Sequence, residues 1–199
     1  MNIVERAKNI LISPKTEWEV IKNEQSTVAD LFTKYALILA LIPAVAGFIG
    51  QSLIGMSLGP FGSFKVPVVN GLIYAVLYYV LTLAGIYLVA FIVDALAPSF
   101  GAQKDMLSSL KVVIYSYTAV WIAGIFQIIP VLAILSILGL YSLYLLYLGL
   151  NIVKGSPADK VVGYTVVVVI ITIVVYFIIG AIVGAIALGG LMMSGMRGF

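Results

Sequence analysis

The feature that most constrains this chain is an apolar stretch from Lys111 to Asn151, which has no charged residue after its first and a single proline, Pro130. As one straight helix it would be about 60 Å long, about twice the roughly 30 Å hydrocarbon thickness of a bilayer. The stretch must therefore turn back on itself. Because proline lacks an N–H donor and disfavours helix at the preceding residue, the turn is expected at Ile129-Pro130. The two tyrosine-rich ends of this hairpin then meet at one membrane face.

The composition extends this conclusion to the whole chain. Of its 199 residues, 63% are hydrophobic and 10% are charged, outside the balance of soluble globular domains. The predicted fold is all-α, a polytopic membrane protein with five transmembrane helices over residues 27–199 and a short amphipathic segment over 1–26. The five spans are expected at about 31–54, 68–97, 110–128, 131–152 and 161–190.

The leading segment has apolar residues on one side of a helical wheel, among them Ile3, Ile10 and Leu11, with charged residues opposite. This pattern is typical of a helix that lies at a membrane interface. Ser13-Pro14 then begins a second short helix, in which Trp18 is expected at headgroup level. We predict that the segment contacts the bilayer surface or a partner protein.

Asp30 belongs to the same predicted contact region, and a second role competes for it. It lies three residues after Thr27, which is the spacing of a capping box at the start of the first span.

The positive charges set the expected orientation. With five spans, the side that holds the N-terminus carries nine Lys and Arg residues and the other side carries two. We therefore expect a cytoplasmic N-terminus and an exterior C-terminus. The nine are Arg6, Lys8, Lys15, Lys22, Lys34, Lys104, Lys111, Lys154 and Lys160; the two are Lys65 and Arg197.

Asp94 is the only carboxylate inside an apolar run, and such a residue needs a partner. Lys111 is the expected partner; the alternative is that Asp94 reaches headgroup water beside Lys104 or Lys111. The tyrosines nearby either form an aromatic belt or line a polar vestibule in the cytoplasmic half. The candidate polar cluster is Asp94, Lys111, Tyr115, Tyr117, Tyr144, Tyr147 and Asn151.

Small residues repeat along the last span at Gly180, Gly184 and Gly189. This spacing suits close contact between helices, either within one chain or between protomers of an oligomer.

The sequence also excludes several functions. With no histidine and no cysteine, the commonest metal ligand and the thiolate nucleophile are both missing. We expect no cofactor, no metal and no enzymatic activity. A net charge of +3, scattered along the chain, does not suggest nucleic acid as a partner.

Together these features resemble the Yip-one family of five-span proteins, named for binding Ypt/Rab GTPases, and most closely its prokaryotic branch. The residues that carry the resemblance are Ser13-Pro14, Glu17-Trp18 and Ile21, Tyr115-Ser116-Tyr117, Ile129-Pro130, and Tyr144 with Tyr147 and Gly149. Eukaryotic relatives have Asp-Leu-Tyr-Gly-Pro before the first span and Gly-Tyr-Ser in the third. Here the corresponding segments are Asp30-Leu31-Phe32 and Ile114-Tyr115-Ser116, which argues against direct binding of a Rab-type GTPase.

The resemblance implies a non-enzymatic integral membrane protein, in a prokaryotic plasma membrane, that associates with lipids, with itself or with related membrane proteins. A scaffold or adaptor for membrane organisation or traffic is the expected function. The alternative is a transporter, channel or lipid-passage protein that uses a polar inner-leaflet vestibule.

Overall fold

The computed structural model describes residues 2–57 and 62–196 of the chain. Five of the described helical stretches are long and apolar enough to cross a bilayer: Val28–Ile54, Val68–Phe100, Met106–Ile128, Pro130–Ile152 and Ala158–Ile186. Each begins and ends within four residues of the expected bounds, so the all-α, five-span prediction is confirmed. The elements are α1 (Ile3–Ile12), α2 (Pro14–Asn23), α3 (Val28–Leu31), η1 (Phe32–Ala36), α4 (Leu37–Leu39), α5 (Leu41–Phe48), η2 (Ile49–Ile54), β1 (Met56–Ser57), β2 (Ser63–Phe64), α6 (Val68–Leu96), η4 (Ala97–Phe100), α7 (Met106–Ser116), α8 (Thr118–Ala123), η5 (Gly124–Ile128), η6 (Pro130–Leu140), α9 (Tyr141–Ile152) and α10 (Ala158–Met196).

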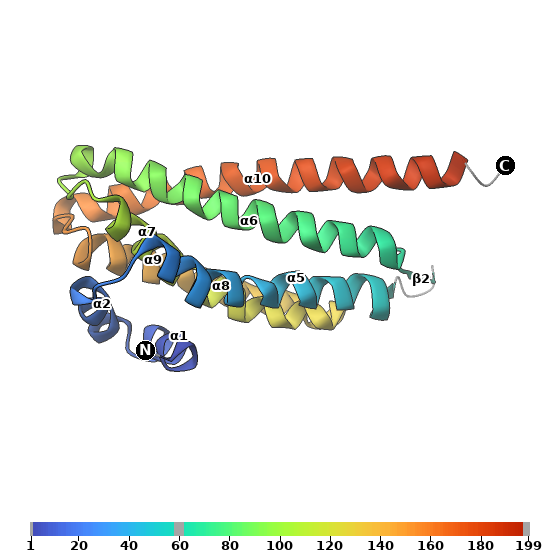
Figure 1. Cartoon of the computed structure of the whole chain (residues 1–199), viewed down its shortest axis with the longest axis horizontal. Helices are drawn as coiled ribbons and strands as arrows, with labels where there is room; N and C mark the ends of the chain where they lie inside the picture. Colours follow the sequence, from blue (N-terminus) through green and yellow to red (C-terminus); the bar gives the residue numbers. More distant parts are fainter. Residues whose placement is uncertain (1, 58–61, 197–199) are drawn as a thin grey trace.

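The spans lie side by side along the long axis of the molecule (Figure 1). One end holds α1 and α2 together with the connections from η4 to α7 and from α9 to α10; the opposite end holds the short β1–β2 hairpin. The long helix α10 packs mainly against α6 and α9, while α5 packs against α6 and η5. The connections that were expected on the N-terminal side therefore do share one end of the bundle.

The chain reverses direction at Ile129, as predicted. Ile129 is extended, with φ −110° and ψ 109°, and Pro130 begins η6 directly after it. Pro43 interrupts the first span without reversing the chain. The α-helix is interrupted at Ala40, next to Leu39, whose carbonyl would accept from an N–H that Pro43 lacks.

Three glycines bring the spans close together. A Cβ added at Gly50 would lie 2.0 Å from the carbonyl oxygen of Gln127, and one added at Gly124 would lie 2.7 Å from Cβ of Pro43. At Gly85 of α6, an added Cβ would lie 2.9 Å from Cδ1 of Ile179 in α10. A larger residue at Gly50 or Gly124 would push the spans apart, whereas at Gly85 the Ile179 side chain would have to move.

Candidate functional site

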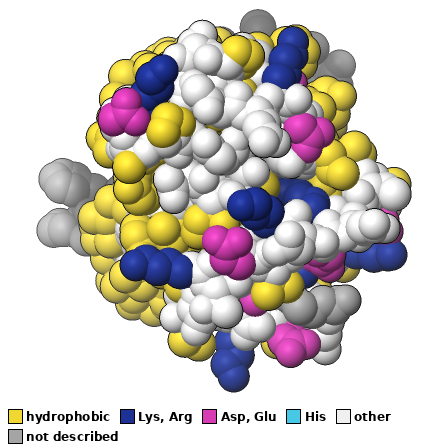
Figure 2. Space-filling model, turned by 90° about the vertical axis from the view of Figure 1, so that its left-hand side faces the viewer, with side chains coloured by type: hydrophobic (Ala, Val, Ile, Leu, Met, Phe, Trp, Pro, Cys, Tyr) yellow, Lys and Arg dark blue, Asp and Glu magenta, His cyan; other side chains and the backbone are white. Residues whose placement is uncertain are grey.

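Buried polar groups gather in two places. The first is the end of the bundle that holds α1 and α2, which we call the charged end. Figure 2 looks onto this end, where side chains of both charge signs spread over the surface and apolar side chains lie toward the rim. The charged end comprises Arg6, Glu17, Glu24, Asp94, Lys111 and Lys154.

Arg6 joins α1 to α2 and to the third span. Its side chain is buried, and Nη1 lies 2.6 Å from Oε1 of Glu17, which is also buried. Nη2 donates to the carboxylate of Glu24, and the guanidinium lies 5.3 Å from the centre of the Tyr115 ring. A buried arginine with two carboxylates and an aromatic face has its charge well compensated. These contacts therefore fix both leading helices against the spans.

Part of the apolar face of the leading helices is covered by protein, while Val4 and Ile12 are exposed. Ile10 and Trp18 are fully buried, and Ile3 and Leu11 are half-buried. Ile10 and Trp18 therefore face the chain itself, and the predicted contact with the bilayer surface or a partner protein is wrong for these two, because an amphipathic face meets a helix bundle in the same way as it meets a bilayer. For Ile3 and Leu11 it stays a prediction.

Gly149 in α9 makes room for the Trp18 ring. A Cβ at Gly149 would lie 3.0 Å from two atoms of that ring and 3.0 Å from Cγ1 of Val112. Trp18 also meets Tyr115 edge to face, with 6.3 Å between the ring centroids. Residues of three separate motifs, Glu17-Trp18, Tyr115 and Gly149, are thus in contact at the charged end.

Lys111 anchors the end of α2. Its Nζ donates to the carbonyl oxygens of Ile21, at 3.0 Å, and Glu24, at 2.5 Å. A cation in this place satisfies carbonyls that a helix C-terminus leaves without partners. The predicted pairing of Lys111 with Asp94 is therefore wrong.

Asp94 pairs with Lys154 instead. Nζ of Lys154 lies 3.1 Å from Oδ1 of Asp94, and the lysine also donates to Oγ of Ser109 at 2.8 Å and to the Asp105 carbonyl at 3.0 Å. The Lys154 side chain is fully buried. Gly155, with φ +68°, provides a bend after Lys154 that only glycine adopts readily.

Ionisation at this end follows from burial and pairing. Burial lowers the pKa of Lys154, and the carboxylate of Asp94 opposes that shift. Burial raises the pKa of Asp105, but hydrogen bonds from Ser108 and Leu107 outweigh it and hold the pKa below its ordinary value. Asp105 accepts those bonds as the N-cap of α7.

Several predicted positions have structural partners. Asp30 and Thr27 form the capping box of α3, and Asp30 also pairs with Lys34 at 2.6 Å. Asn151 donates from Nδ2 to the carbonyl of Ser156 at 3.0 Å, within the turn after α9. The capping role of Asp30, one of the two considered, is confirmed.

The remaining tyrosines of the predicted cluster are dispersed. Tyr144 is exposed beside Tyr141, with 5.6 Å between the ring centroids, and Tyr147 is half-buried against the core. Gly180 and Gly184 have nothing within 4 Å of an added Cβ, so they make no close helix contact inside the described chain. Gly189 lies outside the residues whose surroundings the structure describes.

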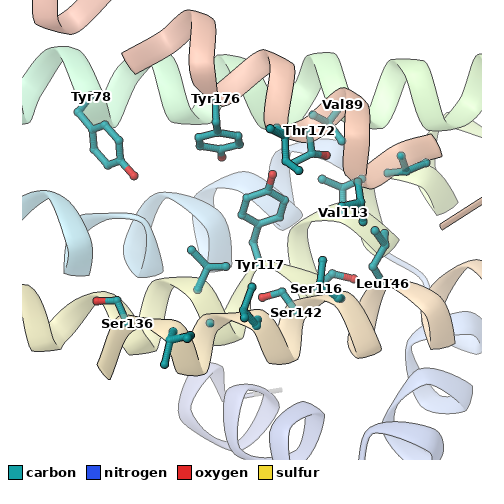
Figure 3. A pocket seen from close by; sticks show the side chains of 18 of the residues that line it. Tyr78, Val89, Val113, Ser116, Tyr117, Ser136, Ser142, Leu146, Thr172 and Tyr176 are labelled. Atoms are coloured by element: carbon teal, nitrogen blue, oxygen red, sulfur yellow. The ribbon is translucent and has the colours of Figure 1, made fainter. Parts of the chain in front are cut away.

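The second place is a cavity of about 490 Å³ between α6, α7–α8, η6–α9 and α10, which we call the mid-membrane cavity (Figure 3). Its walls are mostly apolar. The polar residues that line it are Tyr78, Ser116, Tyr117, Gln127, Ser136, Ser142, Thr172 and Tyr176.

Two of these hydroxyls, those of Ser116 and Ser142, are buried and have no hydrogen-bond partner among the described residues. Tyr117 points across the cavity toward Thr172 and Tyr176 in Figure 3, and its ring stacks on Tyr176 with 5.8 Å between centroids. Of the predicted polar cluster, Tyr117 alone lines this cavity. The polar space therefore lies between the helices at mid-span, whereas the sequence placed it in the inner leaflet.

A bundle of five apolar spans defines a multi-pass integral membrane protein. The chain belongs to the Yip1 domain family, whose family model matches residues 8–182. The family resemblance noted in the sequence is thereby confirmed, and the motif residues of the charged end and of the hairpin lie inside the matched region.

Curated relatives include the Escherichia coli "Inner membrane protein YohC", in strain K12 and in a strain of serotype O6:H1. In each, 117 residues align with 28% identity, which is 59% of this chain and 60% of the relative. The match thus spans less than two thirds of the relatives' length. No solved structure matches this chain.

Proposed function

We propose that this protein is a non-enzymatic membrane scaffold or adaptor that binds membrane proteins, including further copies of itself, inside the bilayer. The outer face of α10 carries this proposal. Phe177 and Ile173 are exposed on this helix, and Gly180 and Gly184 leave open space beside its backbone. Surrounding lipid by itself would explain why apolar side chains are exposed on this helix. The row of small residues points further, because it lets a second helix approach closely.

The distribution of charge supports a binding role over a chemical one. Among the described residues, each buried charged side chain already has a structural partner, as Arg6 has in Glu17 and Lys154 in Asp94. A hydrolase normally holds a base beside a nucleophile, or ligands around a metal. The chain has no histidine or cysteine for such a site, and its buried carboxylates and cations are paired with one another or with backbone carbonyls.

We further propose that the protein lies in a prokaryotic plasma membrane with the charged end in the cytoplasm. Nine of the eleven Lys and Arg residues belong to that side, which the positive-inside rule assigns to the cytoplasm. Single-cysteine variants at Lys104 and Lys65 test this orientation in intact cells. An impermeant thiol reagent should label position 65 and spare position 104; the reverse pattern would contradict it.

Oxidative cross-linking in native membranes tests the scaffold. Because the chain has no cysteine, Gly184→Cys places a single thiol on the outer face of α10. Val183→Cys is the matched control, since Val183 is buried within the chain. We expect a cross-linked dimer, or a conjugate with another membrane protein, from position 184 only. Monomer at both positions, with the same result at Phe177→Cys, would refute assembly through this face.

A second candidate function, passage of a solute, ion or lipid, is favoured by one observation. The mid-membrane cavity shares Tyr78 and Gln127 with a neighbouring cavity of about 240 Å³, which is also lined by Gln51 and Tyr74. Polar side chains thus continue from mid-span toward the end of the bundle that holds the β1–β2 hairpin. Flux into liposomes that contain the purified protein, compared with a Gln127→Leu variant, tests this function separately from cross-linking.

A further inference from the structure

We propose that the mid-membrane cavity binds one uncharged lipid whose head carries carbonyl and hydroxyl oxygens, as in a diacylglycerol. The first argument is the unpaired hydroxyls. Ser116 is only 2% exposed, and its Oγ has no partner among the described residues, as is true of the Oγ of Ser142. A buried hydroxyl without a partner costs stability. Groups held in this state on the wall of a cavity are suited to bind a ligand's oxygens.

The second argument is depth. Tyr117 is the central residue of the span Met106–Ile128, and it points toward Thr172 of α10 across the cavity (Figure 3). Tyr117 is therefore about 16 Å from either end of its helical stretch, at 1.5 Å per residue. These hydroxyls lie near the bilayer midplane, where a phosphate head would have to leave water.

The third argument is charge. Among the described residues that line the cavity, none carries a charge. A fatty acid anion or a phospholipid head would find no counter-ion there, and an isolated buried anion is strongly unfavourable. An uncharged head with ester carbonyls and one hydroxyl can accept from the serine and tyrosine hydroxyls and donate in return.

The fourth argument is access. On the rim of the cavity, Ile137 and Leu140 of η6 and Ile173 of α10 are exposed and apolar. The helix α10 packs mainly against α6 and α9, which leaves the cavity open to lipid between α10 and η6. Acyl chains can extend through this opening into the bilayer, so the cavity has to hold only the head and the first part of the chains.

Thermal unfolding of the full-length protein in mild detergent tests the proposal, with dioctanoylglycerol as the probe. A ligand that binds only the folded state raises the melting temperature. Dioctanoylphosphatidic acid has the same chains and a charged head, so we expect it to raise the melting temperature much less. Equal shifts from the two lipids, or no shift from dioctanoylglycerol because the cavity holds only water, would overturn the proposal.

Hydroxyl deletions locate the site. The double variant Ser116→Ala/Ser142→Ala should melt like the wild type without lipid and bind dioctanoylglycerol at least about tenfold more weakly. Ser99→Ala, at an exposed position outside the cavity, is the matched control and should bind normally. If the double variant does not fold, Tyr176→Phe makes the same test, because it removes a hydroxyl and keeps the ring. Wild-type affinity in the variants that fold would overturn the site.

Discussion

The charged end and the mid-membrane cavity differ in whether their buried polar groups have partners. At the charged end, Lys154 makes three polar contacts and Arg6 pairs with two carboxylates. In the cavity, the hydroxyls of Ser116 and Ser142 have no partner among the described residues. Both places are enclosed by the same spans. The difference indicates that the first set of polar groups holds the fold together, while the second is available to a ligand.

This comparison predicts where substitutions cost stability. A paired buried charge becomes expensive when its partner is removed, because the remaining charge has lost its compensation. A hydroxyl that bonds to nothing in the folded chain has no such contact to lose. Stability should therefore be sensitive at the charged end and insensitive in the cavity, while ligand affinity should show the reverse.

The largest effect is expected at the Asp94–Lys154 pair. Lys154→Met should lower stability by about 3–5 kcal/mol, since it leaves the Asp94 carboxylate without its cation. Asp94→Asn should cost somewhat less, and the double variant should recover part of the loss. Thermal unfolding of the four proteins in one detergent measures the coupling.

The matched control for that cycle is Asp94→Asn with Lys111→Met. Lys111 bonds to the carbonyls of Ile21 and Glu24, so its loss should simply add to that of Asp94. Recovery in this second double variant, and not in the first, would mean that the pairing described here is incorrect.

A smaller effect is expected at Arg6. Arg6→Met removes the cation from Glu17 and Glu24 and should cost roughly 3 kcal/mol, mainly by releasing α1 and α2 from the spans. Limited proteolysis should then cleave in residues 2–24 at a protease dose that leaves the wild type intact. Lys8→Met, on the exposed face of the same helix, is the control and should resist like the wild type.

A still smaller effect is expected at Asp105, which caps α7 beside the Lys154 network. Asp105→Ala should cost about 1 kcal/mol, because two N–H groups at the start of α7 lose their acceptor. Asp105→Asn should retain most of the stability, since asparagine also caps well. An equal loss in both variants would instead assign the effect to the negative charge.

The spans, the hairpin and the capping box could be predicted because each depends on local chemistry. Apolar runs of bilayer length, Pro130 after Ile129, and the spacing of Thr27 and Asp30 determine these features within a few residues. The partner of Asp94 could not be predicted in this way. It is 60 residues away in sequence, in a turn whose glycine directs Lys154 inward.

Two further features depend on packing that a sequence pattern does not encode. The apolar face that contains Ile10 and Trp18 has the same sequence pattern whether the surface opposite it is lipid or protein. The mid-membrane cavity exists because α10 leaves a gap beside η6, which no local pattern specifies. Tyr117 was found as one of a set of tyrosines, whereas the spacing of Ser142 and Tyr176 gave no signal.

One measurement tests the difference between the two regions most directly: the melting temperatures of Ser109→Ala and Ser116→Ala in detergent without added lipid. Each variant removes one buried serine hydroxyl from α7. The Ser109 hydroxyl donates to Oδ1 of Asp94 at 3.1 Å and accepts from Nζ of Lys154 at 2.8 Å, whereas that of Ser116 has no described partner. We predict that Ser109→Ala loses about 1–2 kcal/mol of stability and that Ser116→Ala loses none. Equal losses in the two variants would contradict the account, because the cavity hydroxyls would then be structural.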